Sequence, residues 1–371
     1  MNKSNITGAG NDILVNKENF PDDNFRKWLL MHDFVQNGVI TKEKIAGITE
    51  INVREKGICS LDGIQFFTAL TDLDCSHNNL TTLNVSACTA LNELYCSFNK
   101  LTTLDVSKNT ALTALCCSCN QLSVLDVSAC FTLNELDCCS NKLTTLDVSK
   151  NTALTKLYCY WNQLTFLDVS KNTALTALDC YDNKLTSLDV SGCTALDELD
   201  CRQNKLLALL VSGCTALTVL ACNCNNLTTL DLSDCIRLKD LQCRKNRLTQ
   251  LNLSACKALR LLSCAGNQLK TLDVYSCTAL SVLECVHNYI CGTDMDNLIN
   301  SLHCKGGDIF LIDYDCEDEG NVCTEEQKEK IEEKGWKSDD IYYDYEYYEE
   351  YYCENYWPIN YDDDEDSQLD E

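Results

Sequence analysis

One 21-residue unit repeats, without insertion or deletion, through the centre of this 371-residue chain. Its first copy runs from Leu70 to Ala90 and reads LTDLDCSHNNLTTLNVSACTA; ten copies are complete and an eleventh ends at Ile290. A fixed period of this length predicts a solenoid, in which each repeat forms one coil and neighbouring coils share a core. The leading leucines are Leu70, Leu91, Leu112, Leu133, Leu154, Leu175, Leu196, Leu217, Leu238, Leu259 and Leu280.

Each unit contains two similar halves. The first half reads L-x-x-L-x-C-x-x-N, as in Leu154–Asn162, and the second reads L-x-x-L-x-V-x-x-N/C, as in Leu164–Asn172. The L-x-C and L-x-V triplets alternate with period two, which predicts a short strand in each half with both side chains inward. Roughly six buried side chains per coil cannot offset the entropy of ordering the coil, so stacking must stabilise it.

An unbroken column of asparagines follows the first triplet of every copy. Because a carboxamide both donates and accepts, we expect these side chains to bind backbone groups of the turn and of neighbouring coils. The matching position in the second half alternates between Asn and Cys, as in Asn172 and Cys193. The first column consists of Asn78, Asn99, Asn120, Asn141, Asn162, Asn183, Asn204, Asn225, Asn246, Asn267 and Asn288.

This pattern resembles the leucine-rich-repeat family, whose motif is L-x-x-L-x-L-x-x-N/C-x-L. It is most similar to the short, doubly nested 21-residue type of internalin-like bacterial surface and secreted proteins, over about 220 residues. The resemblance implies a right-handed leucine-rich-repeat solenoid of β-rich coils, in the α/β superhelix class. The family is defined by its scaffold, so function has to be argued from the surface. One departure is that Cys replaces the third leucine in every copy.

The chain divides into four predicted segments. We expect a disordered N-terminus, through residue 15, and a helical cap within residues 1–47, followed by the solenoid over 48–290 with a degenerate first coil. A small α+β C-terminal cap should occupy 291–337, and an acidic, tyrosine-rich tail 338–371. Its terminal acids are expected to be disordered.

Two short helices are predicted in the N-terminal cap. Asp22 can cap a helix that continues to Leu29, and a second helix should start at Thr41. Together they should cover the open apolar end of the first coil. Between them, residues 33–44 resemble a decayed EF-hand loop, but Lys44 stands where calcium requires a bidentate Glu. We therefore expect a turn there rather than a calcium site.

The C-terminal cap should contain a helix over 293–302, a strand over 309–312 and a helix over 324–334 that opens with a capping box. The acidic residues in 313–318 lack the glycine and the glutamate of an EF-hand. We therefore expect them to form a solvated loop.

Charge and hydropathy exclude several classes of partner. The formal net charge of −26 disfavours nucleic acid and anionic membrane surfaces. No stretch of about 18 apolar residues is present, so no membrane insertion is expected. The first eleven residues lack the apolar run of a signal peptide. The protein is therefore expected to be cytoplasmic, or secreted or on the cell surface if a signal has been removed.

The 28 cysteines could indicate a disulfide framework. However, eleven occupy the inward strand position and seven the Asn/Cys column, where thiols behave as small buried hydrophobic groups. We therefore expect mostly reduced thiols. Exceptions should come from Cys59, Cys291, Cys304, Cys316, Cys323 and Cys353, which lie outside these columns.

Aromatic side chains occupy variable positions beside the first-half triplets of the middle coils, flanked by acids such as Asp179 and Asp200. Exposed together on a rigid concave face, they would suit a protein-binding hot spot. The alternative is that stacked aromatic rings only cover strand edges. The candidate partner-binding residues are Tyr95, Phe98, Tyr158, Tyr160, Trp161, Tyr181 and Arg202.

A column of aspartates runs along the second-half triplets. Carboxylates about 5 Å apart should repel one another, so neighbouring Ser and Thr hydroxyls are expected to offset the repulsion. A cation-binding edge is the alternative. The aspartates are Asp105, Asp126, Asp147, Asp168, Asp189, Asp231 and Asp273.

No catalytic machinery is evident in the sequence. The four histidines are scattered, no glycine-rich phosphate loop is present, and the repeat accounts for Cys117 and Cys222 in the two cysteine-dense stretches. We therefore predict a monomeric, non-enzymatic scaffold or adaptor without a metal or cofactor, which binds a protein or a glycan. The alternative is an intracellular structural or signalling scaffold that works through the acidic tail.

Overall fold

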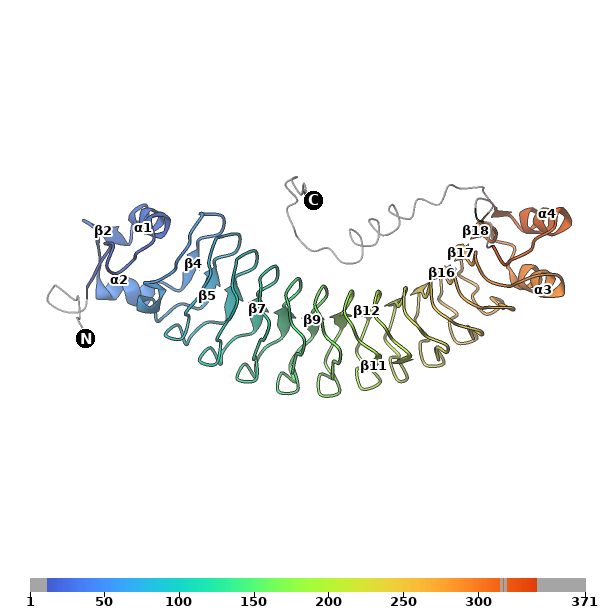
Figure 1. Cartoon of the computed structure of the whole chain (residues 1–371), viewed down its shortest axis with the longest axis horizontal. Helices are drawn as coiled ribbons and strands as arrows, with labels where there is room; N and C mark the ends of the chain where they lie inside the picture. Colours follow the sequence, from blue (N-terminus) through green and yellow to red (C-terminus); the bar gives the residue numbers. More distant parts are fainter. Residues whose placement is uncertain (1–11, 314–315, 317–318, 339–371) are drawn as a thin grey trace.

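The computed structural model describes residues 12–313, 316 and 319–338. The predicted tail therefore lies outside the described residues except for Ser338, and so do residues 1–11 of the N-terminus. Figure 1 shows the coils stacked along a shallow arc, with two helices at each end. These are α1 (Asp23–Leu30), α2 (Lys42–Gly47), α3 (Thr293–Ser301) and α4 (Glu325–Glu333).

A single 14-stranded sheet runs the length of the arc, and all its neighbouring strands are parallel. Successive coils pair at a constant offset, so that Leu157 lies opposite Leu136 and Leu178. This register confirms the predicted leucine-rich-repeat solenoid. The strands are β4 (Glu50–Asn52), β5 (Asp72–Asp74), β6 (Glu93–Tyr95), β7 (Ala114–Cys116), β8 (Glu135–Asp137), β9 (Lys156–Tyr158), β10 (Ala177–Asp179), β12 (Glu198–Asp200), β14 (Val219–Ala221), β15 (Asp240–Gln242), β16 (Leu261–Ser263), β17 (Val282–Glu284), β18 (Gly307–Phe310) and β19 (Trp336–Lys337).

The predicted second-half strands are mostly absent from the described coils. Only β11 (Ser187–Asp189) and β13 (Ala208–Leu210) pair there, apart from one isolated bridge between Asp105 and Asp126. The leucine and valine of this half are buried all the same. The 14-stranded sheet follows the inner side of the arc and β11 lies toward the outer side (Figure 1), where the coils fan apart. Wider spacing there prevents a continuous ladder of backbone hydrogen bonds.

The asparagine column bonds as predicted, and Asn162 illustrates the pattern. Its Nδ2 donates to the carbonyl oxygens of Cys159 at 3.1 Å and Tyr160 at 3.2 Å in its own coil, and of Cys138 at 3.0 Å in the preceding coil. Its Oδ1 accepts from the Leu143 N–H at 2.9 Å. Each such side chain therefore joins two coils, as a donor through Nδ2 and as an acceptor through Oδ1.

The second-half column is satisfied less completely. Asn172 Nδ2 donates to the carbonyl oxygens of Val148 at 3.0 Å and Asn151 at 2.8 Å. Its buried Oδ1 has no hydrogen-bond partner in the described part of the chain. In another coil, the Cys130 thiol makes the equivalent contact to the Asn109 carbonyl oxygen at 3.7 Å. The similarity of the two arrangements explains why Asn and Cys alternate in this column.

A third column has left-handed backbone. The residue before each column asparagine has a positive φ, from 45° at Asp182 to 64° at Gly266, and only Gly266 adopts this conformation without steric cost. This conformation could not be predicted from the sequence, because the position carries no preferred residue type. The non-glycine members are His77, Phe98, Cys119, Ser140, Trp161, Asp182, Gln203, Cys224, Lys245 and His287.

The inward cysteines lie in the core, and each cysteine in the described part of the chain is a free thiol. Burial raises the pKa of the Cys243 thiol to about 12. A thiol with so high a pKa is rarely ionised near neutral pH, so the column packs as neutral, weakly polar side chains.

At the N-terminal end both predicted helices are present. Asp22 caps α1 by accepting from the N–H groups of Asn24 and Phe25, and Thr41 caps α2. Phe20 packs into the core beside the short 3₁₀ helix η1 (Ile64–Phe66).

The loop between these helices differs from the expectation of a simple turn. It is a hairpin of β2 (Val35–Gln36) and β3 (Val39–Ile40) around Asn37 and Gly38, which both have positive φ. An Asn-Gly pair favours this two-residue turn, a signal that the EF-hand comparison obscured. In addition, β1 (Ile13–Leu14) pairs with β3, so predicted disorder through residue 15 is wrong for Ile13 and Leu14.

At the C-terminal end, Thr324 and Gln327 form the predicted capping box of α4. Asn321 continues the asparagine column there, because its Nδ2 donates to the Cys285 carbonyl oxygen at 2.8 Å and its Oδ1 accepts from the Ile290 N–H at 2.8 Å. No helix in the described part of the chain is both long and apolar enough to cross a membrane.

Candidate functional site

The candidate partner-binding residues gather in two groups on the 14-stranded sheet. They lie on the face that points away from the core, along the concave side of the arc. Tyr95 and Phe98 belong to the coil of β6, while the other five belong to the coils of β9, β10 and β12. β9 lies three strands along the sheet from β6, or about 14 Å at the spacing of parallel strands. We call the second group the aromatic patch, which consists of Tyr158, Tyr160, Trp161, Tyr181 and Arg202.

Trp161 is the most exposed member of the aromatic patch, with 52% of its surface accessible. Its ring meets Tyr160 edge-on at a centroid distance of 5.6 Å and lies 6.3 Å from the tilted ring of Tyr181. Tyr160 itself is only 7% exposed, which corrects the prediction that all these aromatic rings would be exposed together. Tyr160 therefore supports Trp161 from within the coil.

Arg202 is also buried, at 6% exposed, rather than a free cation of the surface. Its Nε and Nη2 donate to Asp200 Oδ2 at 2.9 and 2.7 Å. Its guanidinium carbon lies 5.1 Å from the centre of the Tyr181 ring, within cation–π range. The ion pair therefore holds the guanidinium against Tyr181 and restrains that ring.

Two buried carboxyl groups lie side by side beneath the aromatic patch. Asp179 and Asp200 are register partners in β10 and β12, and the Tyr181 N–H donates to Asp179 Oδ1 at 2.9 Å. Burial, and then the neighbouring Asp200, raise the pKa of Asp179 well above its usual value. Burial, with nearby carboxylates, also raises the pKa of the Tyr158 phenol. Tyr158 therefore stays neutral near the exposed indole of Trp161.

The first group is more enclosed than expected. Tyr95 donates its hydroxyl to Glu93 Oε2 at 2.8 Å, and Phe98 stacks on His77 with centroids 4.2 Å apart and planes 16° apart. Both aromatic side chains are half-buried. This group therefore offers less free apolar surface than Trp161.

A polar cluster fills the sheet face between the two groups. The thiols of Cys116 and Cys139 donate to opposite oxygens of Asp137, at 2.9 and 2.7 Å. Ser118 donates to Ser97 at 2.9 Å. Burial and Asp137 raise the pKa of Cys116 to about 12. The thiol therefore stays protonated, which argues against a nucleophilic role.

The aspartate column is held within each coil. Asp105 Oδ1 accepts from the Ser107 N–H at 2.9 Å, and the same bond recurs at Asp126, Asp147 and Asp168. Hydrogen bonds from the serine hydroxyl and N–H lower the pKa of Asp105. Serine thus offsets the repulsion as predicted, but with its backbone N–H as well as its hydroxyl.

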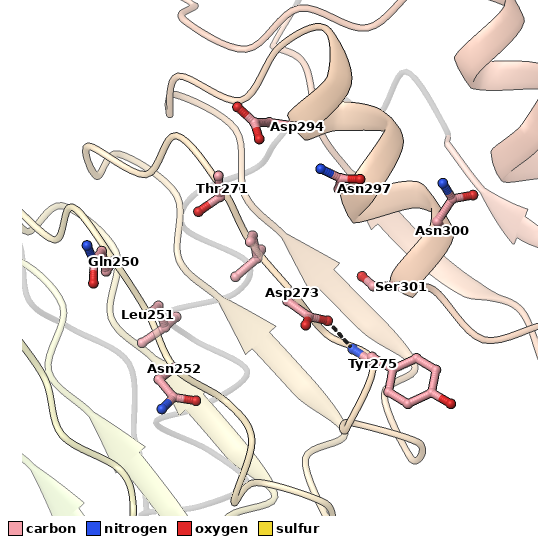
Figure 2. A pocket seen from close by; sticks show the side chains of 11 residues that line it. Gln250, Leu251, Asn252, Thr271, Asp273, Tyr275, Asp294, Asn297, Asn300 and Ser301 are labelled. Atoms are coloured by element: carbon pink, nitrogen blue, oxygen red, sulfur yellow. Dashed lines mark hydrogen bonds between the residues drawn. The ribbon is translucent and has the colours of Figure 1, made fainter.

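A polar groove of about 670 Å³ opens where the outer side of the last coils meets α3. Figure 2 shows amide and carboxylate side chains from both elements around it. Tyr275, at its edge, is 77% exposed, and its N–H donates to Asp273 Oδ1 at 2.8 Å. The polar lining includes Gln250, Asn252, Asp273, Asp294, Asn297 and Asn300.

One group of three side chains in the described part of the chain could hold a metal ion. It consists of His287, Asp313 and Cys316, whose ligand atoms all lie within 4.8 Å of one another. The sequence did not reveal this group, because His287 belongs to the last coil while the other two belong to the segment after α3.

Comparisons with known proteins identify relatives of the scaffold. No family model matches the sequence. Over 68 residues, or 18% of the chain, it is 40% identical to Internalin J of Listeria monocytogenes, a match that spans 7% of that protein. The solved functional domain of InlJ from Listeria monocytogenes, described as including a cysteine ladder, is 32% identical with a TM-score of 0.50. That comparison covers 82% of this chain and 83% of the InlJ domain.

Two more distant structures share the fold. The internalin InlF of Listeria monocytogenes is 22% identical with a TM-score of 0.71, covering 88% of this chain and 96% of that one. The plant peptide hormone receptor RGFR1, solved in complex with RGF2, is 22% identical with a TM-score of 0.57. It covers 67% of this chain and 44% of the receptor chain.

Proposed function

Because this chain belongs to the internalin-like leucine-rich-repeat proteins of bacteria, we propose that it is a scaffold that binds a protein partner through the aromatic patch. The proposal assigns binding to the outward face of the 14-stranded sheet and needs no catalytic group. The fold supports it, since the related receptor RGFR1 is solved with RGF2 bound. The choice of surface rests on the geometry of the aromatic patch in this chain.

The exposed indole of Trp161 carries the proposal. Buried tyrosines and tryptophans at the centre of an interface contribute most of the binding energy in many complexes. Here the edge contact with Tyr160 and the tilted contact with Tyr181 restrain the indole before any partner arrives. A restrained side chain loses little rotamer entropy on binding, so more of the contact energy appears as affinity.

Charge around the aromatic patch favours a basic partner. Lys156 pairs with Glu135 at 3.4 Å on the same face. Asp182 adds an acidic group in the coil next to Trp161, and Glu198 lies near enough to raise the pKa of Tyr158. Acidic side chains at the rim of an interface steer a positively charged partner and suppress wrong ones. We therefore propose a partner that places an apolar side chain on Trp161 and basic side chains around it.

The test is affinity capture from host-cell extracts with the wild-type chain and two variants. Trp161→Asn removes the indole while keeping a residue that tolerates positive φ, the backbone conformation at this position. Phe166→Asn is the matched control, because Phe166 lies in the same coil and is 65% exposed. A partner bound by the wild type and the control should bind Trp161→Asn at least tenfold more weakly. Equal loss in both variants, or none in either, would refute binding through the aromatic patch.

A second candidate function is glycan binding in the polar groove. Amides and carboxylates form paired hydrogen bonds with neighbouring hydroxyl groups, and the exposed Tyr275 ring offers an apolar face beside them. Its two carboxylates, Asp273 and Asp294, favour a neutral sugar over an anionic one. Binding on an array of neutral oligosaccharides should weaken in Asn297→Ala and persist in Trp161→Asn. Binding unchanged by Asn297→Ala would exclude the groove.

A further inference from the structure

We propose that the junction between the last coil and the C-terminal segment binds one zinc-class divalent metal ion. The ligands would be His287 Nε2, an Asp313 carboxylate oxygen and the Cys316 thiolate. The site is independent of the aromatic patch, and its role would be to fasten the C-terminal segment to the solenoid.

The three ligand atoms already stand close to the spacing of a tetrahedral site. His287 Nε2 lies 3.0 Å from Asp313 Oδ2, and the whole set lies within 4.8 Å. Zinc–ligand bonds of about 2.0–2.3 Å place tetrahedral ligands roughly 3.2–3.8 Å apart. The observed separations therefore need adjustments of about 1 Å or less. A fourth position would be left for water.

A buried carboxylate fixes two of these ligands. Glu319 has a side chain only 7% exposed, and its oxygens accept from the N–H groups of His287 at 2.9 Å and Asp313 at 3.0 Å. It also accepts from the Asn321 N–H at 2.8 Å. One side chain thus positions backbone from the last coil and from the following segment. In metal sites, hydrogen bonds from residues behind the ligands commonly hold the ligands in place.

Glu319 also orients the imidazole ring. Its Oε2 lies 3.8 Å from His287 Nδ1, on the opposite side of the ring from Asp313. Before a metal binds, Nε2 donates its proton to Asp313. On binding, the imidazole proton would move to Nδ1, where the Glu319 carboxylate favours it, and the Nε2 lone pair would face the metal. Binding would release the Cys316 proton to solvent, with no change of oxidation state.

The donor set selects the class of metal. One imidazole nitrogen, one carboxylate oxygen and one thiolate sulfur suit zinc or cobalt, whereas calcium and magnesium prefer oxygen alone. The carboxylate and the thiolate together balance a 2+ charge. The side chains of His287 and Asp313 are 34% and 36% exposed, so an ion can reach them from solvent.

Cobalt(II) is the probe for the test, because a cobalt–thiolate bond gives a charge-transfer absorption band. The full chain, kept reduced, is titrated with cobalt and then with zinc. We expect one equivalent of cobalt to bind with a thiolate band, zinc to displace it, and zinc to raise Tm. Cys316→Ser should lose the band and weaken binding at least tenfold. Cys304→Ser is the matched control, because Cys304 is an exposed free cysteine of the same C-terminal region.

A histidine variant separates the site from adventitious binding to other thiols. His287→Asn suits the positive φ at this position and should weaken cobalt binding at least tenfold, with an unchanged circular dichroism spectrum. No thiolate band in the folded wild type would overturn the proposal. A band of equal strength in Cys316→Ser or in His287→Asn would overturn it too, and would leave the His287–Asp313 contact as a structural tie only.

Discussion

Replacing Asn162 by Ala tests whether the asparagine column stabilises the coils. The side chain makes four hydrogen bonds, but its partners do not depend on it equally. The Cys138 oxygen also accepts from Asn141, and the Cys159 oxygen from Asn183. The Tyr160 oxygen also accepts from the Ser140 N–H.

Only the N–H of Leu143 would lose its single partner. A buried donor left unsatisfied costs about 1–3 kcal/mol, and each bond lost from a carbonyl that keeps another donor costs about 0.5 kcal/mol. The three shared carbonyls therefore add about 1.5 kcal/mol. The free energy of unfolding should fall by about 2.5–4.5 kcal/mol in total.

The assay is urea denaturation followed by far-UV circular dichroism. Gln163→Ala is the matched control, because Gln163 is the exposed next residue, and its loss should change the free energy of unfolding by less than about 0.5 kcal/mol. Asn172→Cys is the second control. Removing the unpartnered Oδ1 of Asn172 offsets its two lost donor bonds, so that change should stay within about 1 kcal/mol.

Equal destabilisation by Asn162→Ala and Gln163→Ala would refute this reasoning. A larger loss of stability in Asn172→Cys than in Asn162→Ala would also refute it, because the number of remaining hydrogen-bond partners would then not determine the loss.

Three further changes test other features by the same urea assay. Ser140→Gly should stabilise the fold by about 1 kcal/mol, since Ser140 has a φ of 50° that glycine adopts freely. Gly63→Ala should destabilise it by more than about 1 kcal/mol, because φ is 108° and an added Cβ would meet the Phe20 ring at 2.2 Å. Asp179→Asn should stabilise the fold at pH 7. Because the pKa of Asp179 is raised on folding, the wild type loses stability as the pH rises from 3.8 through the pKa of the folded state. The stability advantage of Asp179→Asn should therefore shrink as the pH is lowered toward 4.

The repeat made most of the scaffold predictable. A constant period sets which residues meet in neighbouring coils, so the register of Leu157 and the bonding of Asn162 follow from one copy. The second-half strands could not be predicted in this way, because the same local pattern lies on the outer side of a curved stack. Curvature is a property of the whole stack and not of any single unit.

The candidate site was harder to predict, because exposure depends on neighbours one coil away. Tyr160 and Tyr181 occupy equivalent positions in the repeat, yet Tyr160 is buried while Tyr181 is half-buried. Arg202 is buried because Asp200 binds it, a pairing within one coil that its position alone did not reveal. Whether a partner uses the aromatic patch stays a prediction.

The metal-capable group and the polar groove both form at the end of the solenoid, where the period stops. His287 and Asp313 meet through a fold-back of the chain that no fixed spacing encodes. Sequence periodicity therefore describes the interior of such a protein well and its ends poorly.

The bonding of the asparagine column also bears on how proteins of this kind change length. Each column asparagine contacts its own coil and the coil before it, and Asn321 repeats those contacts on the last coil. A gene duplication or deletion of one whole unit would therefore leave every remaining coil with equivalent partners. Insertion or deletion of a partial unit would leave the asparagine of that coil out of register with the coil before it. Such a chain can evolve a longer or shorter binding face in steps of one coil, while its terminal segments stay unchanged.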